Sequence, residues 1–484
     1  MSKLLPILHV LSKLVLLYSL LFAVPCAVSW LYDDGTARHF ALSALAGGAA
    51  GSLLWLLTRR FERELKPRDG FILVVLLWIT FALMSAIPML LYVPGLSFTD
   101  GFFEAISGLT TTGSTVLSGL DRLPPAINFW RHFINWVGGM GIIVLAVAIL
   151  PLLGIGGMQL YKAEIPGPMK DSKLAPRIAQ TAANLWYVYA ALTLLCMLCL
   201  WLAGMTPFDG LCHALAAMSL SGVSTHDAGI AYFDSPAIEL VLSCFMVLGA
   251  LNFATHFLCW RNRSLKFYLL DVEARHILAL LAGSILLLSG WLWWLDIYSF
   301  HAALRHVSFN LISIATDAGF ASVDYAQWPI VVPLWMLFLS CVTASSGSVG
   351  GGIKMIRTLI LTRQGYREMN SLLHPRAVLP LMIGTRVIPD SVAFSVLGFI
   401  FVYFISVVLL TFTMIASGLD FISSFSVIVS CINNAGPALG QLGPASNYAG
   451  LSDFQTWVCS FAMLLGRLEI FTILILFTPT FWRK

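Results

Sequence analysis

Four short segments of the chain combine polar side chains with glycine in the same order, at intervals of roughly 100 residues, and such an internal repeat outweighs any single motif. These glycine segments are Thr110, Thr111, Thr112 and Gly113; Ser219, Leu220, Ser221 and Gly222; Thr316, Asp317, Ala318 and Gly319; and Asn433, Asn434, Ala435 and Gly436. A ring of backbone carbonyl oxygens can replace the water shell of a dehydrated monovalent cation. Four such segments around one axis could therefore coordinate a cation.

A conformational requirement explains why each segment ends in glycine. Carbonyl groups that successively face one axis require φ values that residues with a side chain tolerate poorly. The Ser and Thr residues before the glycines either add hydroxyl oxygens or pack the segment against the preceding helix. The sequence TTTG alone would be weak evidence, because Thr/Gly clusters are common in turns and caps. Its fourfold recurrence favours cation coordination.

Composition indicates that these segments belong to a membrane protein. Of 484 residues, 58% are hydrophobic and 11% are charged, whereas soluble proteins carry about 25% charged residues. Several uncharged windows exceed the ~20 residues that a helix needs to cross a bilayer. The long windows are 70–99, 132–161, 178–208, 325–353 and 391–419, and shorter ones are 39–58, 240–260 and 276–295. We expect an all-α polytopic membrane protein whose first helix, within 1–32, is retained rather than cleaved as a secretory signal.

The placement of charges predicts the orientation. Most of the 28 Lys and Arg residues fall in one set of alternating segments: the N-terminus, 59–68, 162–177, 261–275, 354–386 and the last two residues. The other set holds only Arg38, Arg122, Arg131 and Arg305. By the positive-inside rule, both termini are cytoplasmic. The net charge of +4 thus reflects topology and does not indicate a nucleic-acid partner.

Each glycine segment lies between two long apolar runs and is too short to cross the membrane. It must enter from the outer side and return, and non-helical backbone at that depth survives only when it is buried in protein or lines a water-filled cavity. The predicted organisation is an additional helix pair at 1–68, followed by four helix–pore-loop–helix repeats around one pore. The repeats are 69–175, 176–271, 272–388 and 389–484.

The third repeat contains a run of small residues, TASSGSVGGGIK, at 343–354. The candidate functional residues within this run are Ser345, Ser346, Gly347, Ser348, Val349, Gly350, Gly351, Gly352 and Lys354. Glycine destabilises a helix by about 1 kcal/mol relative to alanine, so a helix is expected to break here. A phosphate-binding loop is disfavoured because the Gly-Lys-Ser/Thr ending is missing. A close helix contact of the GxxxG kind and a mobile loop within the membrane both remain open.

Two charged residues in apolar surroundings are further candidates. Arg467 lies in the last apolar run, where a charge is costly and is a functional candidate by default. It is either a structural arginine that pairs or snorkels, or a positive charge in the ion path. Asp317, within the third glycine segment, could be a cation ligand, a charge at the pore mouth or a cap for neighbouring amides.

Other chemistry is not indicated. The histidines are dispersed without metal-site spacing, and most of the nine cysteines lie in apolar runs as small packing residues. There is no nucleophile–base pair, so we predict no enzyme activity. The competing class is a secondary carrier of K⁺ or another monovalent cation coupled to H⁺ or Na⁺. Such carriers are typically built from two inverted halves with paired helix breaks, whereas this chain shows four parallel repeats.

The sequences DGFFEAISGLTTTGSTV, INWVGGMGIIVLAVAILP and SLLHPRAV resemble the bacterial TrkH branch of the Trk/Ktr/HKT superfamily of K⁺ transporters, over the whole chain. The resemblance implies potassium-channel-like repeats and K⁺ uptake across a bacterial inner membrane. It also implies a homodimer and a cytosolic TrkA-type nucleotide-binding ring, with the nucleotide (ATP/ADP or NAD) on that partner. No covalently bound cofactor is expected on this chain.

The resemblance also assigns roles to residues. It implies that the four glycines favour K⁺ over Na⁺, that the loop within 343–354 is a gate, and that Arg467 lies in the ion path. Only the first glycine segment approaches the potassium-channel TVGYG pattern. SLSGVS, ATDAGF and NNAGP depart from it, so the individual carbonyl ligands of those segments are less well defined.

Overall fold

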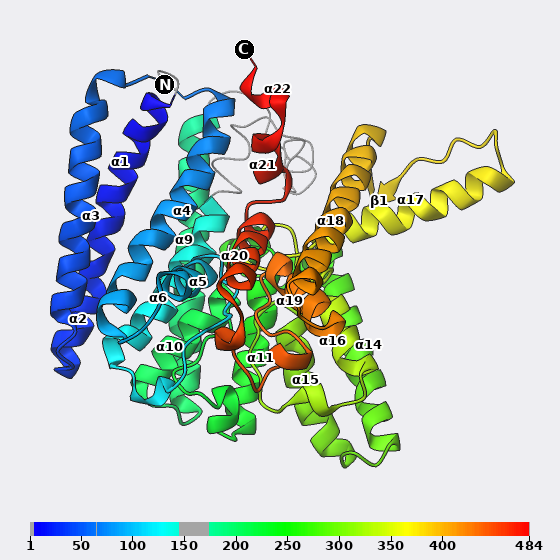
Figure 1. The fold of residues 1–484 in the computed structure, drawn as a ribbon. Coiled ribbons are helices and arrows are strands. Elements are labelled where there is room, and N and C mark those ends of the chain that lie inside the picture. Colours follow the sequence, from blue (N-terminus) through cyan, green and yellow to red (C-terminus); the bar gives the residue numbers. More distant parts are fainter. Residues whose placement is uncertain (1–3, 64, 145–173, 484) are drawn as a thin grey trace.

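The computed structural model describes residues 4–63, 65–144 and 174–483, and within these ranges the chain is all-α apart from one short hairpin (Figure 1). Six described helices are long and apolar enough to cross a membrane, or eight if each of two bent helix pairs forms one span. Large apolar side chains such as Trp30, Leu202 and Phe401 are exposed on the outer faces, as expected of a surface that contacts lipid. The protein is a multi-pass membrane protein, and the predicted fold class is confirmed.

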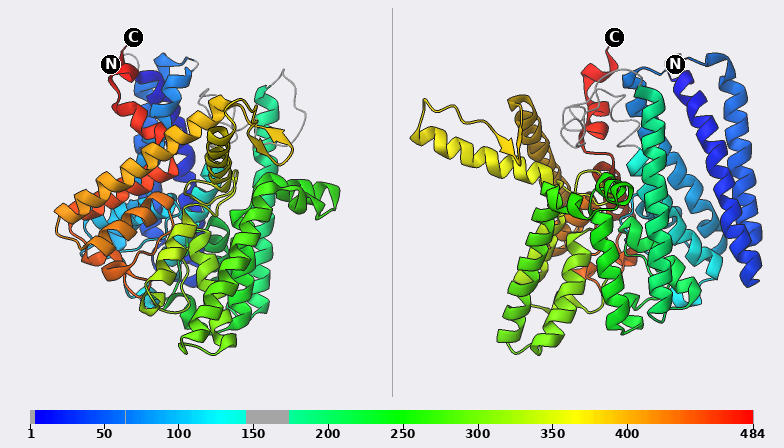
Figure 2. Two further views of the ribbon diagram at one scale, coloured as in Figure 1. Left: turned by 90° about the vertical axis from the view of Figure 1, so that its right-hand side faces the viewer. Right: turned by 180° about the vertical axis from the view of Figure 1, so that it is seen from behind.

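The first helices form a hairpin. Helix α1 (Leu5–Ser19) continues through η1 (Leu20–Phe22) into α2 (Ala23–Tyr32), and α3 (Ala37–Thr58) returns beside them before η2 (Arg59–Phe61). The first and last described residues lie at the same end of the molecule, as Figures 1 and 2 show.

Eight helices of the remaining described chain flank the four helices that lead into the glycine segments. They are α4 (Pro67–Tyr92), α6 (Pro125–Val144), α9 (Leu174–Leu202), α11 (Pro236–Ala250), α14 (Val272–Trp294), α16 (Val331–Ser340), α18 (Asp390–Ala416) and α20 (Asp453–Arg467). Shorter pieces are α12 (Phe253–Asn262), α13 (Lys266–Leu270), α21 (Phe471–Leu474) and α22 (Pro479–Trp482), and the one-turn helices η3 (Leu120–Arg122), η5 (Gly229–Tyr232), η6 (Tyr325–Gln327), η7 (Gly440–Leu442), η8 (Tyr448–Gly450) and η9 (Ile475–Phe477).

The four short helices, here called pore helices, are α5 (Phe98–Leu109), α10 (Pro207–Ser219), α15 (Phe300–Ala315) and α19 (Phe421–Asn433). Each begins at a residue whose side-chain oxygen accepts a hydrogen bond from an amide in the first turn, which is the standard N-cap. The four caps are Ser97, Thr206, Ser299 and Asp420. The sequence therefore starts all four pore helices by the same local device, and each one leads into a glycine segment.

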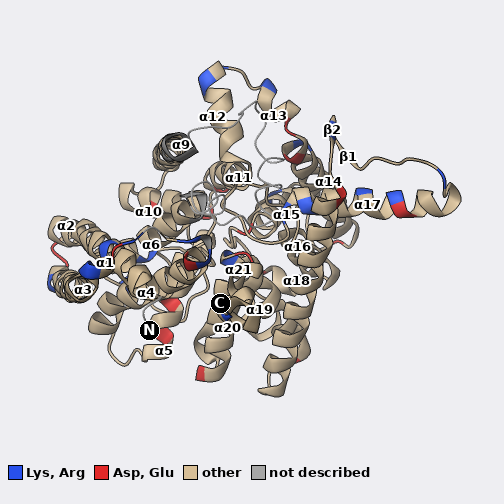
Figure 3. Ribbon diagram, turned by 90° about the horizontal axis from the view of Figure 1, so that it is seen from above, with Lys and Arg blue, Asp and Glu red and all other residues tan. Residues whose placement is uncertain are grey.

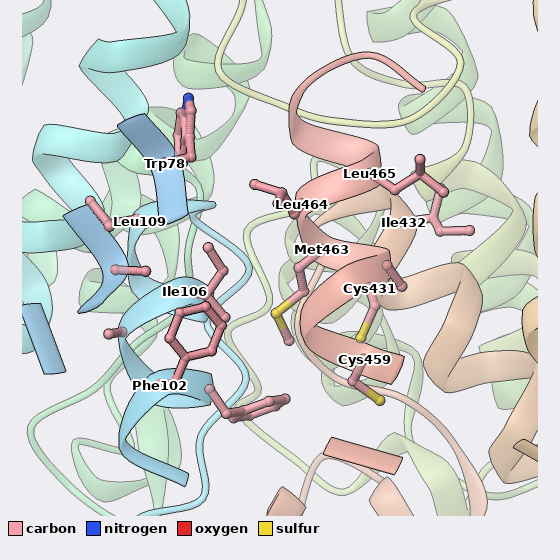
Figure 4. Close-up of a cluster of buried hydrophobic side chains, with 14 of the residues drawn as sticks. Trp78, Phe102, Ile106, Leu109, Cys431, Ile432, Cys459, Met463, Leu464 and Leu465 are labelled. Atoms are coloured by element: carbon pink, nitrogen blue, oxygen red, sulfur yellow. The ribbon is translucent and has the colours of Figure 1, made fainter. Parts of the chain in front are cut away.

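The pore helices are held in a closed circle. Contacts run in order through α5, α6, α10, α11, α15, α16, α19 and α20, and α20 packs back against α5. In Figure 3, seen from above, α5 and α10 lie on one side of the molecule, and α15 and α19 lie to the right of them. Figure 4 shows part of the packing: Ile106 and Leu109 of α5 lie in one buried cluster with Met463 of α20 and Ile432 of α19. Because lipid gives helices no hydrophobic reason to associate, such close packing holds the circle together.

Several helices are broken where the sequence predicts one apolar span. The window 240–260 is divided into α11 and α12, which are bent by 101°. The reason is local, because the Asn252 side chain accepts a hydrogen bond from Ala254 N and starts a new helix. A second bend, of 108°, separates α20 from Phe471–Phe477. In the window 325–353, only the ten residues of α16 form an α-helix.

The basic segment 354–386, which the charge pattern predicts as an inner loop, is mostly ordered. It forms α17 (Met355–Leu373) and an antiparallel hairpin of β1 (Met382–Ile383) and β2 (Arg386–Val387). Figure 1 shows α17 projecting from the body of the molecule. The end of the predicted window 132–161 and most of the basic segment 162–177 lie outside the described residues.

Candidate functional site

All four glycine segments leave their pore helices through the same turn. The residue two positions before the glycine has a left-handed φ: 56° at Thr111, 53° at Leu220, 64° at Asp317 and 60° at Asn434. The next amide then donates back to a pore-helix carbonyl: Thr112 to Ser107, Ser221 to Ala216, Ala318 to Ser313 and Ala435 to Ser430, at 2.8–3.0 Å. This turn satisfies the end of each helix in the manner of a left-handed C-cap.

The four glycines form a closed ring. The evidence is the set of short distances between a Cβ atom added at each glycine and the backbone of the next segment. A Cβ atom added at Gly113 would lie 1.5 Å from the carbonyl oxygen of Ser221, one at Gly222 would lie 2.3 Å from Ala318, one at Gly319 would lie 2.6 Å from Ala435, and one at Gly436 would lie 2.5 Å from Thr112. Real Cβ contacts essentially never fall under 3.0 Å. Each glycine therefore faces the carbonyl just before the next glycine, and the fourth segment meets the first.

The carbonyl oxygens of the glycine segments are largely free to take a ligand. In the part of the chain that the structure describes, no hydrogen bond reaches those of the first three segments. In the fourth, Gly436 accepts from Tyr448 Oη at 2.7 Å and Ser114 Oγ at 3.1 Å. A ring of uncommitted carbonyls in a dehydrated site is suited to a monovalent cation.

The hydroxyl groups that begin three of the segments bond to the pore helices instead. Thr110 Oγ1 donates to Ile106 O at 2.7 Å, and Thr316 Oγ1 donates to Ile312 O at 2.7 Å. Ser219 Oγ makes the same bond to Leu215 O at 2.8 Å. Of the two roles that the sequence leaves open for Ser and Thr, this geometry favours packing the segment against its helix.

Polar residues inside the pore helices brace the chain that follows each glycine, and the sequence interpretation missed them. Glu104 of α5 accepts hydrogen bonds from Thr115 Oγ1 at 2.8 Å and Val116 N at 3.1 Å. Its other oxygen accepts from Arg131 Nε of α6 at 2.8 Å, and both side chains are at most 5% exposed. Breaking one partner of such a buried pair typically costs about 3–5 kcal/mol.

The residue at the corresponding position of each of the next two pore helices also contacts the chain that follows its glycine. His213 contacts Ser224 Oγ through Nε2 at 3.0 Å, and Asn310 Oδ1 accepts from Ser322 N at 3.1 Å. Glu104, His213 and Asn310 each lie nine residues before their glycine. A polar residue recurring at that spacing in otherwise apolar helices is the signal that could have identified them.

A cavity of about 140 Å³ lies against the ring, and its lining includes all four glycines, Arg131, His226 and Asp227. His226 follows the second glycine segment and links two loops beside this cavity. Its ring contacts Asp121 of η3 and stacks on Tyr232 at 3.6 Å between centroids. Asp227 accepts a hydrogen bond from Leu120 N. The first and second segments are thus joined above the ring as well as within it.

The residues 343–354 form a loop that lies against the end of the glycine segments opposite to this cavity. A Cβ atom added at Gly351 would lie 1.9 Å from the carbonyl oxygen of Asn433, and one at Gly350 would lie 3.5 Å from that of Thr316. Both carbonyls belong to the first residue of their segments. Most of the loop is buried, with Ser345 and Val349 completely so, whereas Gly347 is exposed.

The loop is fixed from several sides. Ser345 N donates to Ala250 O at 2.9 Å, which ties the loop to the bend between α11 and α12. Lys354 Nζ donates to Gly350 O at 2.6 Å, within the loop. Lys354 has φ +69°, an uncommon conformation for a residue with a side chain, and such conformations usually cost about 1–3 kcal/mol. The loop therefore holds some conformational strain.

Arg467 is the last residue of α20, and its side chain is buried beside this loop. Its Nη1 donates to Val349 O at 2.8 Å and its Nη2 donates to Gly138 O at 3.3 Å. Among the described residues, no carboxylate forms a salt bridge with it. Glu469 pairs instead with Arg357, at 2.5 Å. Arg467 is therefore neither ion-paired nor directed outward, and it joins α20 to the loop and to α6.

Asp317 contacts the same loop from above. Its Oδ2 accepts a hydrogen bond from Gly351 N at 3.0 Å, and the residue is 1% exposed. Of the three roles that the sequence leaves open for this carboxylate, the contact favours capping of a neighbouring amide. The third glycine segment and the 343–354 loop are therefore directly linked.

The cysteines and possible metal ligands are the remaining features that the sequence raises. All nine cysteines are free, and Cys196 and Cys199 lie on α9. Within the described ranges, no group of three or more His, Cys, Asp and Glu side chains is arranged to hold a metal ion.

Comparison with known proteins gives consistent results. Residues 38–484 match the family model described as "TrkH: Cation transport protein". The chain is 45% identical to the Trk system potassium uptake protein TrkH of Halomonas elongata, over 99% of both chains, and 44% identical to TrkH of Escherichia coli (strain K12), over 98% and 99%. A solved structure titled as the potassium transporter TrkH from Vibrio parahaemolyticus superposes with a TM-score of 0.91 and 42% identity, covering 99% of this chain and 100% of that one.

Proposed function

The chain belongs to the TrkH family of cation transport proteins, and from that premise we propose that it takes up K⁺ across a bacterial inner membrane. The four glycine segments act as the selectivity filter: residues 110–113, 219–222, 316–319 and 433–436. The single observation that carries this proposal is the closed ring of glycines, each facing the carbonyl before the next glycine. That arrangement supports stacked carbonyl sites that a K⁺ ion enters from the outer cavity.

The 343–354 loop and Arg467 act as the gate. The loop touches the inner end of the filter, and Arg467 holds it through Val349 O. In this position the loop obstructs the ion path, and the arginine's positive charge repels a departing cation. A gate must have a second arrangement, and glycine-rich backbone provides the freedom to reach it.

Regulation and assembly belong to the same proposal. We expect a homodimer, with both termini cytoplasmic, and a cytosolic TrkA-type ring that carries the nucleotide. The support is the family membership and the charge pattern. Helix α17 projects from the body (Figure 1), and together with the hairpin it carries Arg363, Arg367 and Arg386, which makes them a candidate docking surface for the ring.

Flux into liposomes tests the transport proposal. The full-length chain is reconstituted, and currents or cation fluxes are measured with K⁺ and Na⁺ at several voltages and pH values. We expect K⁺ to be preferred, with a reversal potential that follows the K⁺ gradient alone. A reversal potential that shifts with the pH gradient or the Na⁺ gradient would support the coupled carrier instead.

Deletion tests the gate. Removing 346–352 should raise K⁺ flux without changing the preference for K⁺, because the filter itself is retained. An equally long deletion at the exposed stretch 374–380 is the control and should leave flux unchanged. If the 346–352 deletion leaves flux at the wild-type level, the loop is not a gate.

A further inference from the structure

Glu273 makes a contact that joins the two ends of the 343–354 loop. It lies in the first turn of α14, outside the filter, and is 7% exposed. Its Oε2 accepts hydrogen bonds from Ser346 N at 2.9 Å and from Ile356 N at 3.2 Å. One carboxylate oxygen therefore holds the beginning of the loop and the residue just after it.

Two side-chain contacts of the loop lie between these two points. Asp317 binds Gly351 N, and Arg467 binds Val349 O. Both partners belong to the filter and the pore lining, so their contacts must change when the ion path opens. Glu273 belongs to neither, because it is on the helix that begins the third repeat.

The position of Glu273 is itself fixed by the preceding turn. Asp271 caps α14 by accepting from Glu273 N at 3.0 Å and Ala274 N at 3.2 Å. The same Asp271 accepts a hydrogen bond from Thr255 Oγ1 of α12 at 2.7 Å. The turn from α12 through α13 to α14 thus sets where the Glu273 carboxylate lies.

We propose that Glu273 is the positioning residue of the gate: it fixes both ends of the loop, so that only the residues between Ser346 and Ile356 leave the filter when the path opens. This inference rests on the proposed gate. Charge-assisted hydrogen bonds to backbone amides are stronger than neutral ones, and two of them on one oxygen hold the loop ends together. Without them, the loop ends are still joined by the backbone bonds from Ile353 N to Cys341 O at 2.6 Å and from Met355 N to Ala344 O at 2.7 Å, but the closed position is less populated.

The two requirements on this residue, reach and charge, can be separated. Glu273→Gln keeps the reach and an acceptor oxygen but loses the charge. Glu273→Asp keeps the charge, but its side chain is one methylene shorter and does not reach both amides. Glu273→Ala removes both. Glu62→Ala is the matched control, because Glu62 is exposed and contacts Lys13 rather than the loop.

The experiment measures K⁺ flux of the full-length chain in liposomes without a regulatory partner. We expect flux to rise about tenfold in Glu273→Asp and Glu273→Ala, and to stay within about twofold of wild type in Glu273→Gln, since a neutral acceptor retains much of a hydrogen bond. The preference for K⁺ over Na⁺ and the Glu62→Ala variant should be unchanged. Hydrogen exchange at Ser346 and Ile356 should accelerate only in the Asp and Ala variants, which tests the contact independently of transport.

Two results would overturn the proposal. Wild-type flux and exchange in both Glu273→Asp and Glu273→Ala would show that the contact does not position the loop. A rise of flux in Glu273→Gln together with wild-type flux in Glu273→Asp would assign the effect to charge rather than reach. Deletion of 346–352 separates these failures from that of the gate itself: if it raises flux, the gate stands and only the role of Glu273 falls.

Discussion

Replacing Gly113 with alanine tests whether the ring of four glycines sets the carbonyl positions. Gly113 has φ +77°, and an added Cβ atom would lie 1.5 Å from the Ser221 carbonyl oxygen. That distance must double to reach the 3.0 Å below which real Cβ contacts essentially never occur. The clash is with backbone of another segment, so it cannot be relieved by turning a side chain. The carbonyl must move away from the axis, or the first segment must.

Gly119 provides a matched control six residues along the chain. Its φ is +72°, almost the same as that of Gly113, but nothing lies within 4 Å of an added Cβ atom. Alanine in a left-handed conformation costs roughly 1–2 kcal/mol at either position. The strain is therefore common to both variants, and only Gly113→Ala adds the clash within the ring.

The assay is the ratio of K⁺ to Na⁺ flux in liposomes, together with the melting temperature in detergent. We expect both variants to lose stability through the shared strain, and Gly113→Ala to lose more because of the added clash. Only Gly113→Ala should lose K⁺ preference, by about tenfold or more, which corresponds to about 1.4 kcal/mol. Unchanged preference in Gly113→Ala, or an equal loss in Gly119→Ala, would refute the argument from the ring.

Three further predictions follow from single contacts. Arg467→Ala should raise K⁺ flux several-fold at unchanged K⁺ preference, because it removes the bond to Val349 O and the charge that we propose obstructs the path. Unchanged flux in liposomes would contradict the proposed place of Arg467 in the ion path. Arg131→Met should lower stability by about 3–5 kcal/mol because Glu104 is left buried without its partner, and an unaltered melting temperature would be inconsistent with that pair. The hydrogen bond from His226 lowers the pKa of Asp121 from its ordinary value of 3.8. The contact between His226 and Asp121 therefore stabilises the folded loop above that value, and this stabilisation is lost as pH falls through the lowered pKa. Hydrogen exchange of the loop around Asp121 should accelerate over that pH range in wild type. A variant His226→Asn should show no such acceleration.

The sequence predicted those parts of the fold that depend on local composition. The uncharged windows identified apolar spans because a bilayer requires long runs without charge. The aligned glycines brought together four segments that are far apart in sequence but adjacent in the structure. A single sequence is enough to detect both features, because the glycine segments recur and the apolar spans extend over many residues.

Contacts between distant side chains were not predictable in the same way. Counting charges placed Arg131 among the outer basic residues, but it is buried and paired with Glu104 on another helix. The bend between α11 and α12 was missed because apolar composition is the same for a straight and a bent helix. Asn252 is one of several polar residues in the window, with Ser243, Thr255 and His256. Its role as a cap appears once the hydrogen bond from Ala254 N is seen.

The proposed gate and the proposed filter should respond to different substitutions. The glycine ring is formed by carbonyls of the third residue of each segment, such as Ser221 and Ala318. The 343–354 loop approaches carbonyls of the first residue, those of Asn433 and Thr316. The two structures therefore contact opposite ends of the same short segments. Changes confined to the loop should alter how often the path is open, whereas changes in the ring should alter which cation passes. A loop variant that changed K⁺ preference as strongly as Gly113→Ala would show that the two ends are not independent.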